Sequence, residues 1–105
     1  MAREIPKRQQ KPRRVSDEEV RETILGMCRE AGLDGVVRPE AVARVILPDH
    51  WQTLLKRIRL MSKQLAVAGL LTILRKGEPV DLQEVKGLIH LQITAAGLVV
   101  EAESD

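Results

Sequence analysis

Apolar residues recur at helical spacing in the first third of the chain. Four of them follow one another at steps of four, three and four and so share one helical face: Val20, Ile24, Met27 and Ala31. Ser16 precedes this face and Glu19 stands three residues later, which is the spacing of a capping box. Gly32 is a common type of residue directly after a helix. The pattern predicts a helix over residues 16–31.

A second helical pattern follows a turn at residues 34–35, where Asp precedes Gly. Residues 36–37 are two valines, which suit a very short strand. Pro39 fits the first turn of the next helix, and Pro48 ends it. The buried face of this helix is expected to hold Val42, Ala43, Ile46 and Leu47.

Only residues 48–50 separate this helix from a third one, predicted over residues 50–68 and ending at Gly69. Asp49 is expected to cap it, with Gln52 three residues later in a box-like position. The core face of the third helix is predicted to hold Trp51, Leu54, Leu55, Ile58, Met61, Leu65 and Ala68.

The pattern then changes from helical spacing to alternation. In residues 89–93, Ile89, Leu91 and Ile93 alternate with polar residues, which predicts a strand with one buried face. Residues 70–74 form the partner strand, with Leu71 and Ile73 as the expected inward pair. A long connection containing Gly77 and Pro79 joins the two strands, so the sequence predicts a hairpin.

A short element is expected after the hairpin. Thr94 can cap a helix over the following residues, although Gly97 weakens it, and the chain ends in "ESD" (103–105), which carries two acidic residues. A lone hairpin is marginally stable in water, so it must lean on the three helices. Helix, short strand, helix, tight turn, helix and hairpin is the order of a winged helix. We therefore predict an α+β winged helix-turn-helix, with three helices and a C-terminal β-hairpin wing.

Composition separates a tail from this domain. Residues 1–14 hold six basic residues and one acidic residue, for a net charge of +5, whereas residues 15–105 carry −3. The tail contains almost nothing apolar, so it cannot bury enough surface to offset its ordering entropy. We expect a disordered basic tail over residues 1–14 and one domain over residues 15–105, with a short helix or tail from about residue 94.

Several functional classes are not expected. The single cysteine, Cys28, excludes an intramolecular disulfide and a Cys-based zinc site. His50 and His90 form no recognisable catalytic or metal-binding spacing, and no glycine-rich phosphate loop is present. No apolar run reaches the length of a membrane span, and the N-terminus has no apolar signal-peptide segment. We expect a cytoplasmic protein that is not an enzyme and uses no cofactor or metal.

Residues 15–93 also resemble a small bacterial family known only as a domain of unknown function. The resemblance rests on "VRPEAVAR" (37–44), the Trp51 region after "PDH", "LLKRIRLMSKQLAVAGLL" (54–71), "RKGEPVD" (75–81) and "KGLIHLQI" (86–93). It implies a compact winged-helix domain and supplies no activity. The family pattern usually has Pro at the position of Leu88, which affects how the second strand begins and leaves the order of elements unchanged.

The third helix carries the sharpest candidate for function. On the side opposite its core face, a polar stripe is predicted to hold Gln52, Lys56, Arg59 and Lys63. In a helix-turn-helix the second helix enters the major groove, where Arg and Lys reach guanine edges or phosphates and Gln reads adenine. Any amphipathic helix also has a solvated charged face, and this interpretation has about the same weight from the sequence alone.

Basic residues outside this helix complete the predicted nucleic-acid surface: Arg13 and Arg14 in the tail, and Arg75 and Lys76 at the start of the wing. The equally weighted alternative is a tail that only solubilises the protein or that folds back onto the acidic domain. Two features favour caution, namely a wing with as many acidic as basic residues and a net negative domain. Leu60 and Val67 also lie on the polar side of the third helix, which suits a protein partner. The first hypothesis is nucleic-acid binding, and the second is a protein-interaction module without DNA binding.

Overall fold

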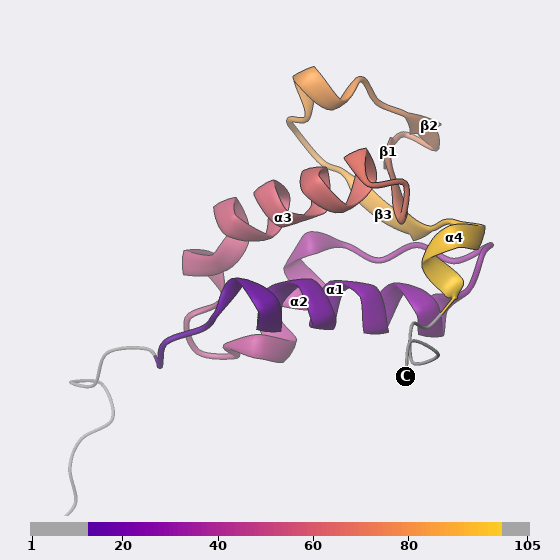
Figure 1. Ribbon diagram of the computed structural model, residues 1–105. Helices are drawn as coiled ribbons and strands as arrows, with labels where there is room; N and C mark the ends of the chain where they lie inside the picture. Colours follow the sequence, from indigo (N-terminus) through magenta and orange to yellow (C-terminus); the bar gives the residue numbers. More distant parts are fainter. Residues whose placement is uncertain (1–12, 100–105) are drawn as a thin grey trace, which may run out of the picture.

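The computed structural model of the protein describes residues 13–99, in which four α-helices pack with a three-stranded antiparallel sheet of order β2-β1-β3 (Figure 1). The elements are α1 (Asp17–Ala31), α2 (Pro39–Ile46), the 3₁₀ turn η2 (Trp51–Leu54), α3 (Leu55–Val67), β1 (Leu71–Arg75), β2 (Glu78–Pro79), the 3₁₀ turn η3 (Leu82–Glu84), β3 (His90–Ile93) and α4 (Ala95–Leu98). The α+β class predicted from the sequence is confirmed. Residues 1–12 of the predicted tail and residues 100–105 lie outside the described residues.

Helix α1 begins as the sequence predicts, with one difference at its cap. The backbone N–H of Glu19 donates to Oγ of Ser16 at 3.0 Å. The Glu19 carboxylate does not complete the capping box, because it pairs with the guanidinium of Arg13 instead. Gly32 ends the helix with a φ of 81°, in the left-handed region that favours glycine.

The connection between α2 and α3 differs from the prediction. Leu47 is the buried C-terminal cap of α2, and the next helix starts with one 3₁₀ turn before it becomes an α-helix at Leu55. The expected cap by Asp49 is wrong, because His50 occupies the cap position and no side chain there accepts from the helix. The tight 3₁₀ turn instead places the Thr53 hydroxyl 2.7 Å from the His50 carbonyl oxygen, to which it donates.

The hairpin strands have the predicted inward faces. In β3 the buried positions alternate with partly buried ones, and Ile73 of β1 stands opposite Leu91. On its other side, Leu91 exchanges two backbone hydrogen bonds of 2.8 Å with Val37, so the predicted short strand is a single bridge. Strand β3 therefore lies between Val37 and β1, and it ties the start of α2 to the hairpin.

The connection between β1 and β3 contains two elements that the sequence did not predict. Lys76 and Gly77 both have positive φ, 55° and 81°, as in a two-residue hairpin turn, and β2 pairs with the end of β1. The chain then forms η3, which packs against α3. The wing thus lies over α3 (Figure 1). Its apolar residues Val80, Leu82 and Val85 pack against the edge of the core.

Helix α4 forms as predicted, with the Thr94 hydroxyl accepting from the backbone N–H of Gly97 at 3.0 Å. Gly97 is required by packing, because a Cβ at this position would collide with the carbonyl oxygen of Leu70 and lie 2.8 Å from Cδ1 of Ile93. The Nε of Arg29 donates to the Gly97 carbonyl oxygen at 2.8 Å and joins α1 to α4. The glycine that weakened the helix prediction is therefore the residue that lets α4 approach the sheet.

The core lies between α1, α2 and α3 and one face of the sheet (Figure 1). It is almost wholly aliphatic, and its most completely buried large side chains are Ile24, Ile58, Ile73 and Leu91. Trp51 is only partly buried at its edge, where the guanidinium of Arg44 lies 4.3 Å from the ring centroid.

Candidate nucleic-acid interface

The polar stripe of the third helix lies on the surface of the protein. Gln52 and Lys56 are exposed, whereas Arg59 and Lys63 are partly buried. Gln52 belongs to the 3₁₀ turn, which advances about 120° per residue, so the α-helical angle predicted for it does not apply. The three cationic residues remain on α3, at spacings of three and four that place them on one face.

Arg59 connects this stripe to the wing. Its Nη2 donates to the carbonyl oxygen of Gly87 at 3.1 Å, in the segment that leads into β3. Its Nε is buried and donates to no acceptor among the described residues. The guanidinium is therefore held at the junction between α3 and the wing.

The wing contributes the other predicted cations. Arg75 and Lys76 are both exposed, and Nη1 of Arg75 donates to the carbonyl oxygen of Lys86 at 3.3 Å. Since Lys86 and Gly87 are consecutive, Arg59 and Arg75 hold the same short segment from two elements. This shared segment makes the α3 stripe and the base of the wing one continuous surface.

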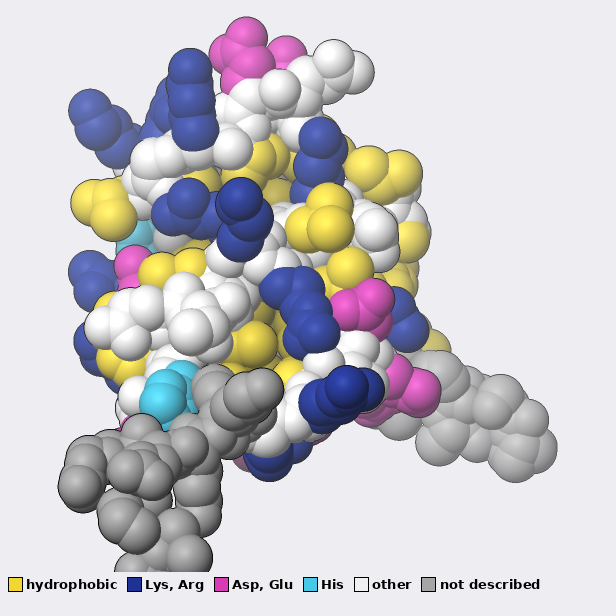
Figure 2. All heavy atoms as spheres, turned by 90° about the vertical axis from the view of Figure 1, so that its left-hand side faces the viewer, with side chains coloured by type: hydrophobic (Ala, Val, Ile, Leu, Met, Phe, Trp, Pro, Cys, Tyr) yellow, Lys and Arg dark blue, Asp and Glu magenta, His cyan; other side chains and the backbone are white. Residues whose placement is uncertain are grey.

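The segment of the chain that forms most of this surface is rich in basic residues. Between His50 and Gly77 there is no acidic residue, and the six basic residues in that segment are Lys56, Arg57, Arg59, Lys63, Arg75 and Lys76. Residues 15–99 hold eleven basic and eleven acidic residues, so the negative excess of the predicted domain comes from residues 101–105. Figure 2, seen from the end where α3 begins, shows Lys and Arg side chains spread over this face, with hydrophobic side chains and a smaller number of Asp and Glu side chains exposed between them.

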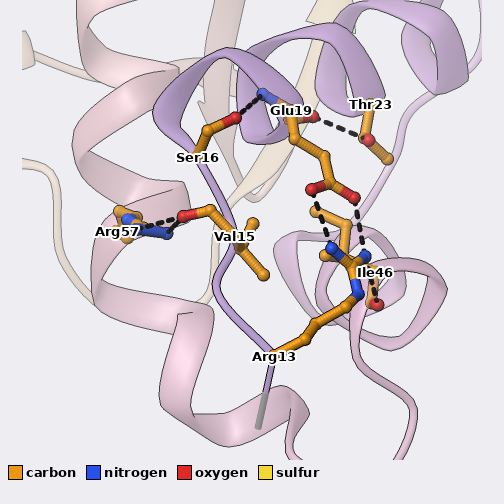
Figure 3. Close-up of polar contacts among 7 residues, drawn as sticks. All are labelled: Arg13, Val15, Ser16, Glu19, Thr23, Ile46 and Arg57. Carbon is orange, nitrogen blue, oxygen red and sulfur yellow. Dashed lines mark hydrogen bonds and ion pairs between the residues drawn. The ribbon is translucent and has the colours of Figure 1, made fainter.

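The predicted tail cations stand at the other end of the candidate surface. Nη1 and Nη2 of Arg13 donate to the two carboxylate oxygens of Glu19 at 3.0 and 2.7 Å, and Nη2 also reaches the carbonyl oxygen of Ile46 at 3.2 Å (Figure 3). The hydrogen bond from Arg13 lowers the pKa of Glu19, and the same pair raises the pKa of Arg13. Arg13 is thus bound to the domain, whereas the neighbouring Arg14 is exposed.

Arg57 is a residue whose role the sequence reasoning missed. Both of its terminal nitrogens donate to the Val15 carbonyl oxygen at 2.6 Å (Figure 3). Its Nε lies 3.2 Å from a carboxylate oxygen of Asp17. These contacts hold the root of the tail beside the first turn of α3. The groove of about 730 Å³ between these elements is lined by residues that include Arg13, Arg14, Thr53 and Arg57. Residues close to Arg57 in the sequence include no acidic partner, and this was the available signal that its partner lies elsewhere in the chain.

The described residues contain neither a cluster of metal ligands, nor a reactive thiol, nor a membrane-spanning helix. Between residues 13 and 99, no three His, Cys, Asp or Glu side chains gather as metal ligands. Burial raises the pKa of the Cys28 thiol to about 11, which keeps it protonated and unreactive at neutral pH. None of the helices described in residues 13–99 combines the length and the apolar character needed to cross a bilayer.

Comparison with known proteins agrees with the resemblance found in the sequence. Residues 17–94 match a family described as a protein of unknown function, DUF3253. The matched region runs from the first residue of α1 to the cap of α4 and so contains the whole candidate surface on α3 and the wing. The search of curated proteins found no match.

Proposed function

The chain belongs to the DUF3253 family, and we propose from its own geometry that it is a winged helix-turn-helix protein that binds nucleic acid without catalysis. In this proposal α3 is the recognition helix in the major groove. The wing and the basic N-terminal arm contact phosphates on either side of it.

Three features of the fold support the winged-helix assignment. The elements follow the order helix, bridge, helix, helix and hairpin. The Val37 bridge pairs with β3, so that β3 is central and the hairpin is attached to the helical core. The short turn between α2 and α3 leaves the outer side of α3 uncovered, with Lys56 and Leu60 exposed.

The observation that carries the function is the contact from Arg59 to Gly87. It joins a cationic helix face to a cationic wing base, and the whole segment from His50 to Gly77 carries no acidic residue. A surface of this kind attracts phosphates. The overall neutrality of residues 15–99 is therefore compatible with a locally positive binding face.

A second candidate function rests on apolar exposure. Leu60 is 52% exposed, Val67 71% and Leu88 73%, which suits a protein-interaction module that uses α3 and the wing on a protein partner. The lysines beside Leu60 and the lack of acidic residues between His50 and Gly77 favour the nucleic-acid proposal over this one.

The test is a fluorescence anisotropy titration with a random duplex over a salt series. Lys56→Ala combined with Lys63→Ala removes two charges without touching the Arg59 contact, and it should lower the slope of log K against log salt by up to about two units. Arg21→Ala combined with Arg38→Ala is the matched control, because it removes the same charge outside α3 and the wing.

Equal losses in the two double variants would mean that only net charge matters and that α3 is not the interface. Wild-type protein that binds neither duplex nor single strands at low salt would reject the proposal. Loss of a protein complex on Leu60→Asp substitution would then support the second function.

A further inference from the structure

Leu60 occupies an unusual position in the middle of the cationic face of α3. Lys56 precedes it by four residues and Lys63 follows it by three, so the three side chains are neighbours on one side of the helix. Leu60 is 52% exposed, and it extends into solvent where the rest of the face is charged. The core does not need this side chain, since the buried face of α3 is made by Ile58, Met61 and Leu65.

The major groove offers an apolar side chain one partner of matching character. Among the base edges, the C5-methyl group of thymine is the apolar contact, and the other groups are hydrogen-bond donors and acceptors. We propose that Leu60 packs on thymine methyl groups and is therefore a specificity-determining residue. This inference rests on the proposed nucleic-acid function and adds to it the class of sequence that is preferred.

The lysines support a duplex as the occupant of this face. Lys56 and Lys63 are separated by about 10 Å along the helix axis, which is the length of about three steps along a duplex strand. Phosphates that border the groove over this length supply negative charge for both flexible lysine side chains, while Leu60 points between them at the bases. A protein partner would have to place one carboxylate against each lysine around an apolar centre.

Val67 is the natural control for Leu60. It lies on the same outward side of α3, is 71% exposed and is the last residue of the helix. Base contacts in a helix-turn-helix come mainly from the N-terminal part of the recognition helix. Val67 lies about 10 Å beyond Leu60 along the axis, so it should not reach the bases.

The experiment measures affinity by anisotropy for four duplexes of 20 base pairs. The first is alternating A·T, and the second is identical except that deoxyuridine replaces every thymidine. The third is alternating G·C, and the fourth carries 5-methylcytosine, which places a methyl group at the same edge of the groove. Alternating sequences present the same edge in every binding register, so the unknown target sequence does not matter.

For wild-type protein, each methylated duplex should bind more tightly than its unmethylated partner, by on the order of fourfold for one covered methyl group. Leu60→Ala should reduce both ratios to about one, whereas Val67→Ala should leave them unchanged. Thermal melting checks that both variants are folded.

Three results would overturn the inference. If wild-type protein binds methylated and unmethylated duplexes with equal affinity, the inference about Leu60 is overturned. Duplex binding, and so the proposed function, would still stand. Ratios that persist in Leu60→Ala would assign the effect to duplex shape. Absence of binding to all four duplexes, together with a dimer in solution that Leu60→Asp dissociates, would assign the face to a second copy of the chain.

Discussion

The guanidinium of Arg57 donates both of its terminal nitrogens to the carbonyl oxygen of Val15, each at 2.6 Å (Figure 3). This contact joins α3 to the residue directly before the cap of α1. The neighbouring residue Lys56 makes no such contact with the described residues and is exposed on the candidate binding face. Two adjacent cations on one helix therefore have different roles, one in the fold and one on the surface.

Arg57→Ala should lower the free energy of unfolding by about 2 kcal/mol, because it leaves a partly buried carbonyl without its charged donors. Lys56→Ala is the neighbouring control and should change it by less than about 0.5 kcal/mol. Urea unfolding followed by Trp51 fluorescence measures both values. Equal stability of the two variants would contradict the anchoring role of Arg57.

Two glycines give opposite predictions for the same substitution. Gly97→Ala should destabilise the protein by about 2 kcal/mol or more, because the added Cβ meets the Leu70 carbonyl oxygen and Ile93. Gly26→Ala should instead stabilise it by about 0.5–1 kcal/mol, since Gly26 lies within α1 and a Cβ there has no contact within 4 Å. Calorimetric melting of both variants tests the packing of α4, and a Gly97→Ala protein as stable as wild type would refute it.

Two serines form a similar pair. Ser62 is fully buried in α3, and its hydroxyl has no hydrogen-bond partner among the described residues. Ser62→Ala should therefore leave stability unchanged or raise it by up to about 1 kcal/mol. Ser16→Ala removes the α1 cap and should cost about 1 kcal/mol. Chemical denaturation should rank the variants in this order, and a large loss for Ser62→Ala would reveal a partner for its hydroxyl.

Cys28 makes stability depend on alkaline pH. Its thiol has a pKa of about 11 in the folded protein, against an ordinary value of 9.0, because burial disfavours the thiolate. Between pH 9 and 11 the unfolded chain loses this proton while the folded protein keeps it, so stability from this group is lost as pH rises. The slope should approach about 1.4 kcal/mol per pH unit within this window.

The control for this prediction is Cys28→Ala, which lacks the titrating group. The difference in unfolding free energy between wild type and Cys28→Ala should be constant below pH 8 and should change between pH 9 and 11. Curves that stay parallel throughout would show that the thiol ionises alike in the folded and unfolded states.

The sequence by itself determined most of the local structure. The spacing of apolar residues, the Ser16 cap, Pro39 and Gly32 were sufficient to place α1, α2 and the alternating face of β3. These features depend on neighbours within a few residues, and local propensity and periodicity therefore describe them well. The same reasoning identified the cationic stripe on α3 and the exposed positions of Leu60 and Val67.

Tertiary structure decided what these elements do together. The Arg59 contact to Gly87 and the close approach of Gly97 to the Leu70 carbonyl oxygen each join residues that are more than twenty positions apart in the chain. The fold of the wing over α3 also brings separate elements together. The Glu19 carboxylate pairs with Arg13 and does not complete the capping box. Arg57 donates to the Val15 carbonyl oxygen, whereas its neighbour Lys56 is exposed. Such choices depend on which partners the packed core brings within hydrogen-bond distance, and no local pattern contains that information.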